Sequence, residues 1–106
     1  MFDELSPTEF VDRCQRGELW QLVDVREPWE IATASVSFAI CIPMAEVANR
    51  LDELDRRQPV AVLCHSGGRS ARIAALLLHT GFEAVANISG GIDAWSRQLD
   101  ANIPRY

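Results

Sequence analysis

The residues with the most evident chemistry are Cys64 and the glycine-rich segment that follows it. Residues 60–63 are an apolar run that predicts a strand, and residues 71–78 predict a helix, so Cys64 lies at the loop between them. Backbone N–H groups of such a loop can point inward, and the positive end of the following helix adds to their field. Because a thiolate is an anion, this environment favours the nucleophilic form of the thiol. The sequence therefore predicts that Cys64 is a catalytic nucleophile.

The loop after Cys64 is predicted to bind the substrate. Its residues are His65, Ser66, Gly67, Gly68, Arg69 and Ser70. Two consecutive glycines permit positive φ angles, which let backbone N–H groups turn toward one centre in the manner of an oxyanion hole. Arg69 offers a planar donor fork to an oxyanion, and Ser70 is expected to cap the helix. His65 is interpreted as a tuning or solvent-facing residue, because adjacent residues of a tight loop usually point apart.

This arrangement makes two demands on the structure. The amides of residues 65–70 must face the sulfur, and the thiol must be reachable from solvent. We expect both conditions to hold.

The composition predicts a compact, cytoplasmic protein of one domain. The chain has 106 residues, of which 48% are hydrophobic, and it contains no apolar run near the ~18 residues that a membrane span requires. Its start is acidic, unlike a secretory signal. The net charge of −5 is spread without long runs of one sign, which argues against a nucleic-acid partner. All ten basic residues are arginine, so lysine chemistry is excluded.

The three cysteines do not form a structural framework. Cys14, Cys41 and Cys64 are spaced unlike a disulfide set or a zinc site, and a reduced compartment is the simpler interpretation. Cys14 falls on the apolar face of a predicted helix and Cys41 within a predicted strand, so both are expected in the core. No metal or organic cofactor is implied.

Strands and helices are predicted to alternate along the chain. The predicted helices cover residues 7–16, 28–32, 44–54, 70–79 and 92–99, and the predicted strands cover residues 21–26, 38–42, 60–63 and 84–88, after a short strand that ends at Leu5. Strands that are nearly continuous in apolar residues indicate a parallel sheet with helices on both faces. Ligands bind beyond the carboxyl ends of such strands, where Cys64 is expected.

Other conspicuous side chains are predicted to be structural. Asp24 and Arg26, at the end of a strand near the loop, are expected to form structural hydrogen bonds or an ion pair that holds loops in place. Trp20, Trp29 and Trp95 are expected to pack rather than bind ligand. Ser6 and Pro7 are typical of the start of a helix.

Four stretches of the chain, in this order, resemble the rhodanese-like family in its single-domain form. They are residues 22–30 (Leu-Val-Asp-Val-Arg-Glu-Pro-Trp-Glu), 42–43 (Ile-Pro), 63–70 (Leu-Cys-His-Ser-Gly-Gly-Arg-Ser) and 90–95 (Gly-Gly-Ile-Asp-Ala-Trp). One departure is plain. Where the family usually carries a segment like Gly-His-Ile-Pro-Gly-Ala, residues 33–39 read Thr-Ala-Ser-Val-Ser-Phe-Ala.

The resemblance implies one rhodanese-like domain over residues 1–106, with α/β architecture and an open, mainly parallel five-stranded sheet. It also implies sulfur transfer through a persulfide on Cys64. The donor would be thiosulfate or another small sulfur-containing anion, and sulfite or its equivalent would leave. Cyanide, a thiol or a protein cysteine would accept the sulfur.

Two other functions stay open at the level of sequence. A cysteine-dependent phosphatase or arsenate reductase also places its anion loop between a strand and a helix, but needs five residues between cysteine and arginine. Only four separate Cys64 from Arg69. A non-catalytic rhodanese-like binding module is the third possibility, although inactive members of the family generally lack the cysteine.

Overall fold

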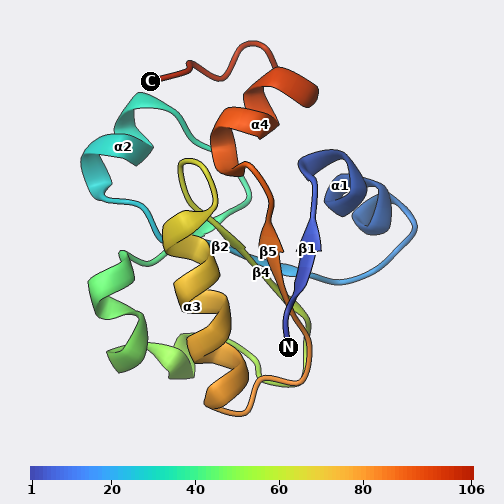
Figure 1. Cartoon of the computed structure of the whole chain (residues 1–106), viewed down its shortest axis with the longest axis vertical. Coiled ribbons are helices and arrows are strands. Elements are labelled where there is room, and N and C mark those ends of the chain that lie inside the picture. Colours follow the sequence, from blue (N-terminus) through green and yellow to red (C-terminus); the bar gives the residue numbers. More distant parts are fainter.

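The fold is built on one parallel sheet of five short strands (Figure 1). The computed structural model describes residues 1–106. The strands are β1 (Asp3–Leu5), β2 (Gln21–Asp24), β3 (Ile40–Cys41), β4 (Val60–Leu63) and β5 (Val85–Ile88), in the spatial order β1-β5-β4-β2-β3. All four neighbouring pairs are parallel. The predicted α/β class with a five-stranded parallel sheet is confirmed.

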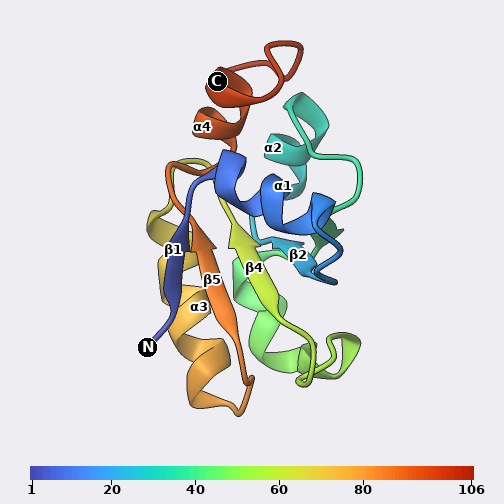
Figure 2. The ribbon, with the colours of Figure 1, turned by 90° about the vertical axis from the view of Figure 1, so that its right-hand side faces the viewer.

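Side chains that alternate along the strands divide the core into two layers. In β4, Val60 and Val62 belong to one buried cluster, whereas Ala61 and Leu63 belong to the other. The first layer is covered by α3 (Gly68–His79), and the second by α1 (Pro7–Gln15) and α4 (Gly91–Gln98). Figure 2 shows α1 and α3 on opposite sides of the sheet. A sheet buried on both faces requires the apolar strands seen in the sequence.

The start of α1 agrees with its sequence signature. Ser6 Oγ accepts a hydrogen bond from the Glu9 N–H at 3.1 Å, and the Glu9 carboxylate accepts one from the Ser6 N–H at 2.9 Å. Pro7 occupies the first turn, where its missing N–H costs no hydrogen bond. The predicted cap is therefore confirmed.

Two predicted elements differ from the structure. Residues 44–54 form two 3-10 helices, η1 (Met44–Asn49) and η2 (Leu51–Glu53), in place of one α-helix. Spacings of three, four and seven predict a helical face, but they do not distinguish the tighter 3-10 winding that buries Val47 and Leu54 here. The predicted strand 38–42 shortens to β3, because the chain turns just before it, where the Ala39 N–H donates to the Val36 carbonyl.

The longest helix, α3, has 12 residues, and none of the helices has the length and apolar character that a membrane crossing requires.

Candidate active site

Cys64 follows β4 directly, at the carboxyl edge of the sheet. The chain then turns through Gly67, whose φ of +110° lies in the left-handed region, and enters α3 at Gly68. The helix thus begins two residues earlier than predicted. The expectation that Ser70 caps it is wrong, because Gly67 occupies the cap position and Ser70 lies within the first turn.

Two hydrogen-bond donors converge on the Cys64 sulfur. The Gly67 N–H donates to Sγ at 3.0 Å, and the Ser70 hydroxyl lies 3.2 Å from the same atom. The sulfur thus lies within hydrogen-bond distance of one backbone group and one side-chain group. No hydrogen bond joins His65 to Sγ, which agrees with its interpretation as something other than a base.

The thiol is more enclosed than expected. Cys64 is 1% exposed, so the expectation that solvent reaches it is wrong for the closed arrangement of this structure. The reason lies in α4, which covers the loop. The Ile92 and Asp93 N–H groups, at the start of this helix, donate to the carbonyls of Cys64 and His65 at 2.9 and 3.1 Å. These bonds hold the loop down against the sheet. A reactant therefore needs a local opening to reach Sγ.

Gly91 allows this close contact between α4 and the loop. A Cβ atom at Gly91 would lie 2.5 Å from the Cys64 carbonyl oxygen and still closer to that of His65. Its φ of +59° is also in the left-handed region. No other residue fits at this junction without moving the backbone of the cysteine loop.

Arg69 is engaged with a carboxylate of α2 (Pro28–Thr33). Its Nη1 and Nη2 donate to the two oxygens of Glu30, each at 2.7 Å. The Glu30 side chain is 4% exposed and that of Arg69 is 32% exposed. Arg69 is the main cause that lowers the pKa of Glu30 to about 2. Glu30 in turn raises the pKa of Arg69 above its ordinary value, and the nearby Cys64 sulfur adds to this effect.

Tyr106 joins this site although it lies far away in sequence. Its ring stacks on that of His65, with centroids 4.1 Å apart and an interplanar angle of 10°. Its hydroxyl donates to Glu30 at 2.9 Å and accepts from Nη1 of Arg26 at 2.9 Å. Nothing in the local sequence around Tyr106 signals this role, because the contact is made only by folding.

The predicted pair of Asp24 and Arg26 is confirmed as a structural feature. Both side chains are fully buried, and Arg26 Nη2 lies 2.7 Å from the Asp24 carboxylate. Arg26 also donates to the carbonyls of Ala34 and Glu30. The pair therefore fixes the turn that carries Glu30 toward the loop.

Asn87 is, after Glu30 and Tyr106, a third residue of the site that the sequence reasoning missed. It is 3% exposed in β5, and its amide N–H donates to the Gly67 carbonyl at 3.2 Å. Its Oδ1 and the Cys64 sulfur share the single proton of the Ser70 hydroxyl, and Oδ1 is the nearer acceptor. Asn87 thus holds both residues whose donors reach the Cys64 sulfur. A polar side chain inside an otherwise apolar strand was the available signal.

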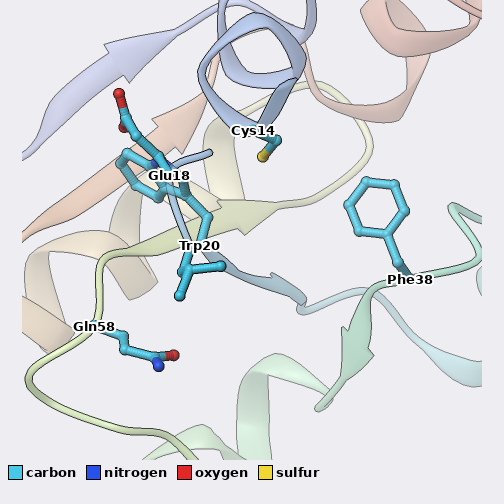
Figure 3. Close-up of a pocket in the computed structure, with 6 residues that line it drawn as sticks. Cys14, Glu18, Trp20, Phe38 and Gln58 are labelled. Atoms are coloured by element: carbon cyan, nitrogen blue, oxygen red, sulfur yellow. The ribbon is translucent and has the colours of Figure 1, made fainter. Parts of the chain in front are cut away.

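The other two thiols lie apart from this loop. Cys14 is half-buried and lines a surface pocket of about 500 Å³ with Glu18, Trp20 and Phe38 (Figure 3). Cys41 is exposed on the edge strand β3, which corrects its expected place in the core. Trp29, expected to pack, is 64% exposed. The structure holds no cluster of three or more His, Cys, Asp or Glu side chains arranged for a metal ion.

Fold and site together define a parallel α/β protein with one thiol held by donors of a tight loop before a helix. A model of the family described as rhodanese-like domain matches residues 6–98. The chain belongs to this rhodanese-like family.

Individual proteins are similar over most of the chain. A protein named sulfurtransferase from Allochromatium vinosum is 35% identical over 97 residues, which cover 92% of this chain and 91% of that protein. A rhodanese-like domain protein from Staphylococcus aureus matches in structure with a TM-score of 0.82 and 26% identity, over 89% of this chain and 91% of that one. A thiosulfate sulfurtransferase from Pseudomonas aeruginosa gives a TM-score of 0.81 and 27% identity, over 97% of this chain but 20% of that protein.

Proposed function

We propose that residues 1–106 act as one rhodanese-like sulfurtransferase domain that uses Cys64 as its nucleophile. The observation that carries this proposal is the convergence of the Gly67 N–H and the Ser70 hydroxyl on Sγ. The name sulfurtransferase given to the relative from Allochromatium vinosum supports it.

The reaction has two balanced steps. The Cys64 thiolate attacks the outer sulfur of thiosulfate or a similar donor, the S–S bond of the donor breaks, and sulfite leaves with the bonding pair. The sulfur stays on the enzyme as a persulfide anion. A thiophilic acceptor, such as cyanide, a thiol or a protein cysteine, then attacks the outer sulfur and restores the thiolate.

The loop residues have complementary roles in this proposal. Of the loop amides, that of Gly67 donates to Sγ, and the Ser70 hydroxyl lies beside the same atom. His65, Ser66 and Gly68 belong to the same turn and are proposed to contact the substrate. Arg69 still has three N–H donors beyond the two that Glu30 accepts, and these can meet an anionic group of the donor. Because Cys64 is 1% exposed, the loop or the His65–Tyr106 stack has to open during each transfer.

Mass spectrometry tests the persulfide directly. The protein is incubated with thiosulfate, and its intact mass and digested peptides are measured. We expect an addition of about 32 Da, one sulfur atom, on the peptide that contains Cys64, and no addition in Cys64→Ser. Subsequent addition of cyanide should remove the adduct.

Other outcomes would replace the proposal. An adduct that persists in Cys64→Ser would place the sulfur elsewhere. Hydrolysis of an aryl phosphate faster than consumption of thiosulfate would favour the phosphatase function. Absence of any adduct with every sulfur donor tried would favour a binding module.

A further inference from the structure

Glu30 has the only carboxylate that forms hydrogen bonds with a side chain of residues 65–70, the loop after Cys64. Its two oxygens accept both terminal nitrogens of Arg69 at 2.7 Å, so the guanidinium faces a full negative charge in ideal fork geometry. A free Arg69 would present a positive charge to an incoming anion. The bound Arg69 presents a neutral pair.

Glu30 is held in place by groups other than Arg69. The Glu27 N–H donates to Oε2 at 2.9 Å, and the Tyr106 hydroxyl donates to Oε1 at 2.9 Å. Its own carbonyl accepts from the buried Arg26 at 3.3 Å. The carboxylate is therefore anchored to the scaffold, and Arg69 is the more exposed member of the pair.

The ionised side chains of the loop and of its one carboxylate partner then sum to one negative charge during reaction. Glu30 and Arg69 cancel, so the Cys64 thiolate leaves one negative charge. Asp93 forms ion pairs with Arg97 and Arg105, but these arginine side chains are 51% and 58% exposed, where solvent and salt screen them. A donor with two negative charges is repelled by this centre more than a donor with one. At a separation of ~6 Å the difference in rate is about threefold with the dielectric of water and about a hundredfold with that of a protein surface, so roughly tenfold is expected between these limits.

We propose that Glu30 is a specificity-determining residue that makes the Cys64 site select against negative charge. The preference for particular sulfur donors rests on the sulfurtransferase function proposed above. The preferred donors are then sulfane-sulfur compounds with at most one negative charge, such as thiosulfonates and protonated persulfides, rather than dianionic thiosulfate. With a thiosulfonate, the Cys64 thiolate attacks the outer sulfur, the S–S bond breaks and a sulfinate leaves. With a protonated persulfide, the Cys64 thiolate attacks the outer sulfur, the S–S bond breaks and a thiolate leaves with the bonding pair. The proton of the transferred sulfur then passes to that thiolate, so the products are a persulfide anion on Cys64 and a free thiol.

Alkylation measures this charge selection without any sulfur transfer. In a background of Cys14→Ser and Cys41→Ser, the rate constants at Cys64 are compared for neutral iodoacetamide and anionic iodoacetate. We expect Glu30→Gln to raise the relative rate of iodoacetate about tenfold. Glu27→Gln removes an exposed carboxylate at the start of α2 that does not contact Arg69. Its amide oxygen can still take the place of the carboxylate in the capping box with Glu30, so the ratio should change less than about twofold.

A second comparison uses two sulfur donors with the same transferred atom. Glu30→Gln should raise kcat/KM for thiosulfate about tenfold relative to kcat/KM for methanethiosulfonate, a monoanion. The wild-type protein provides a test that does not depend on folding of the variant. Its rate with thiosulfate should rise with ionic strength more steeply than its rate with methanethiosulfonate, because salt screens the larger repulsion.

The outcomes separate the two proposals. If Glu30→Gln changes the iodoacetate ratio but no donor forms a persulfide, the sulfurtransferase function fails and the charge selection stands. If persulfide forms but neither the alkylation ratio nor the salt dependence distinguishes the charges, the role of Glu30 is overturned. If Glu27→Gln acts as strongly as Glu30→Gln, the effect comes from net charge and the role of Glu30 is likewise overturned.

Discussion

Cys64 and Cys41 stand at the same edge of the sheet, yet different groups surround the two sulfur atoms. Cys41 ends β3 and lies opposite Asp24 of β2, and Leu63, directly before Cys64, lies opposite the same residue. Cys64 receives two hydrogen-bond donors, whereas the Cys41 sulfur has one distant contact, with the Ala39 carbonyl at 3.9 Å. Partial burial and the neighbouring Asp24 raise the pKa of Cys41. A position at the end of a parallel strand therefore does not by itself surround a thiol with hydrogen-bonding groups. At Cys64 these groups come from the glycine turn and the helix that follow.

Replacement of each cysteine tests this comparison with the largest expected effect. Cys64→Ser should lower the turnover of thiosulfate with cyanide by at least about a thousandfold, because the persulfide cannot form. Cys14→Ser and Cys41→Ser should stay within about twofold of the wild-type rate. The measurement is the rate of thiocyanate formation. A loss of more than tenfold in Cys41→Ser would show that both strand ends take part in sulfur transfer.

Gly91→Ala should disrupt the close contact between the start of α4 and the loop after Cys64. The new methyl group would meet the carbonyls of Cys64 and His65, so the loop or the start of α4 must move. We expect a loss of about 2 to 4 kcal/mol in the free energy of unfolding, measured by urea denaturation. Gly68→Ala serves as the matched control, because its Cβ would meet nothing within 4 Å and its φ is not positive. Equal losses in both variants would contradict the proposed close contact.

Acid should weaken the loop through Glu30 and Arg69. The pKa of Glu30 falls from its ordinary 4.5 to about 2 in the folded protein, so its contribution to stability is complete above pH 4.5 and is lost as the pH falls toward 2. Because the guanidinium of Arg69 is partly exposed and solvent screens the pair, we expect this pH-dependent contribution to the free energy of unfolding to be about 1 to 2 kcal/mol. Urea denaturation at pH 5 and pH 2.5 should show the loss in wild type and a smaller one in Arg69→Gln. A loss of the same size in both would mean that Arg69 does not hold the carboxylate.

The smallest expected effect concerns the thiol of the pocket in Figure 3. Burial, followed by the charge of Glu18, raises the pKa of Cys14. Glu18→Gln should therefore raise the alkylation rate of Cys14 at pH 8 by about twofold, while the new amide can still accept from Trp20. Peptide mapping after iodoacetamide treatment measures this rate. Cys41 lies outside this pocket and should not change, so a parallel rise there would point to general loosening of the fold.

Local sequence patterns determined much of this protein. The apolar runs of β4 and β5, the cap at Ser6 and Pro7, and the strand–glycine turn–helix around Cys64 all depend on neighbouring residues, and each was predictable for that reason. The pair of Asp24 and Arg26 was predictable because its members are two residues apart.

Only the tertiary structure decided what surrounds the thiol. The contacts of Arg69 with Glu30 and of His65 with Tyr106 join residues 39 and 41 positions apart, and no local periodicity encodes them. The enclosure of Cys64 likewise arises from hydrogen bonds with the start of α4. A nucleophile can be predicted from the turn that carries it, but its access and the charge it meets depend on side chains brought together from separate elements by packing.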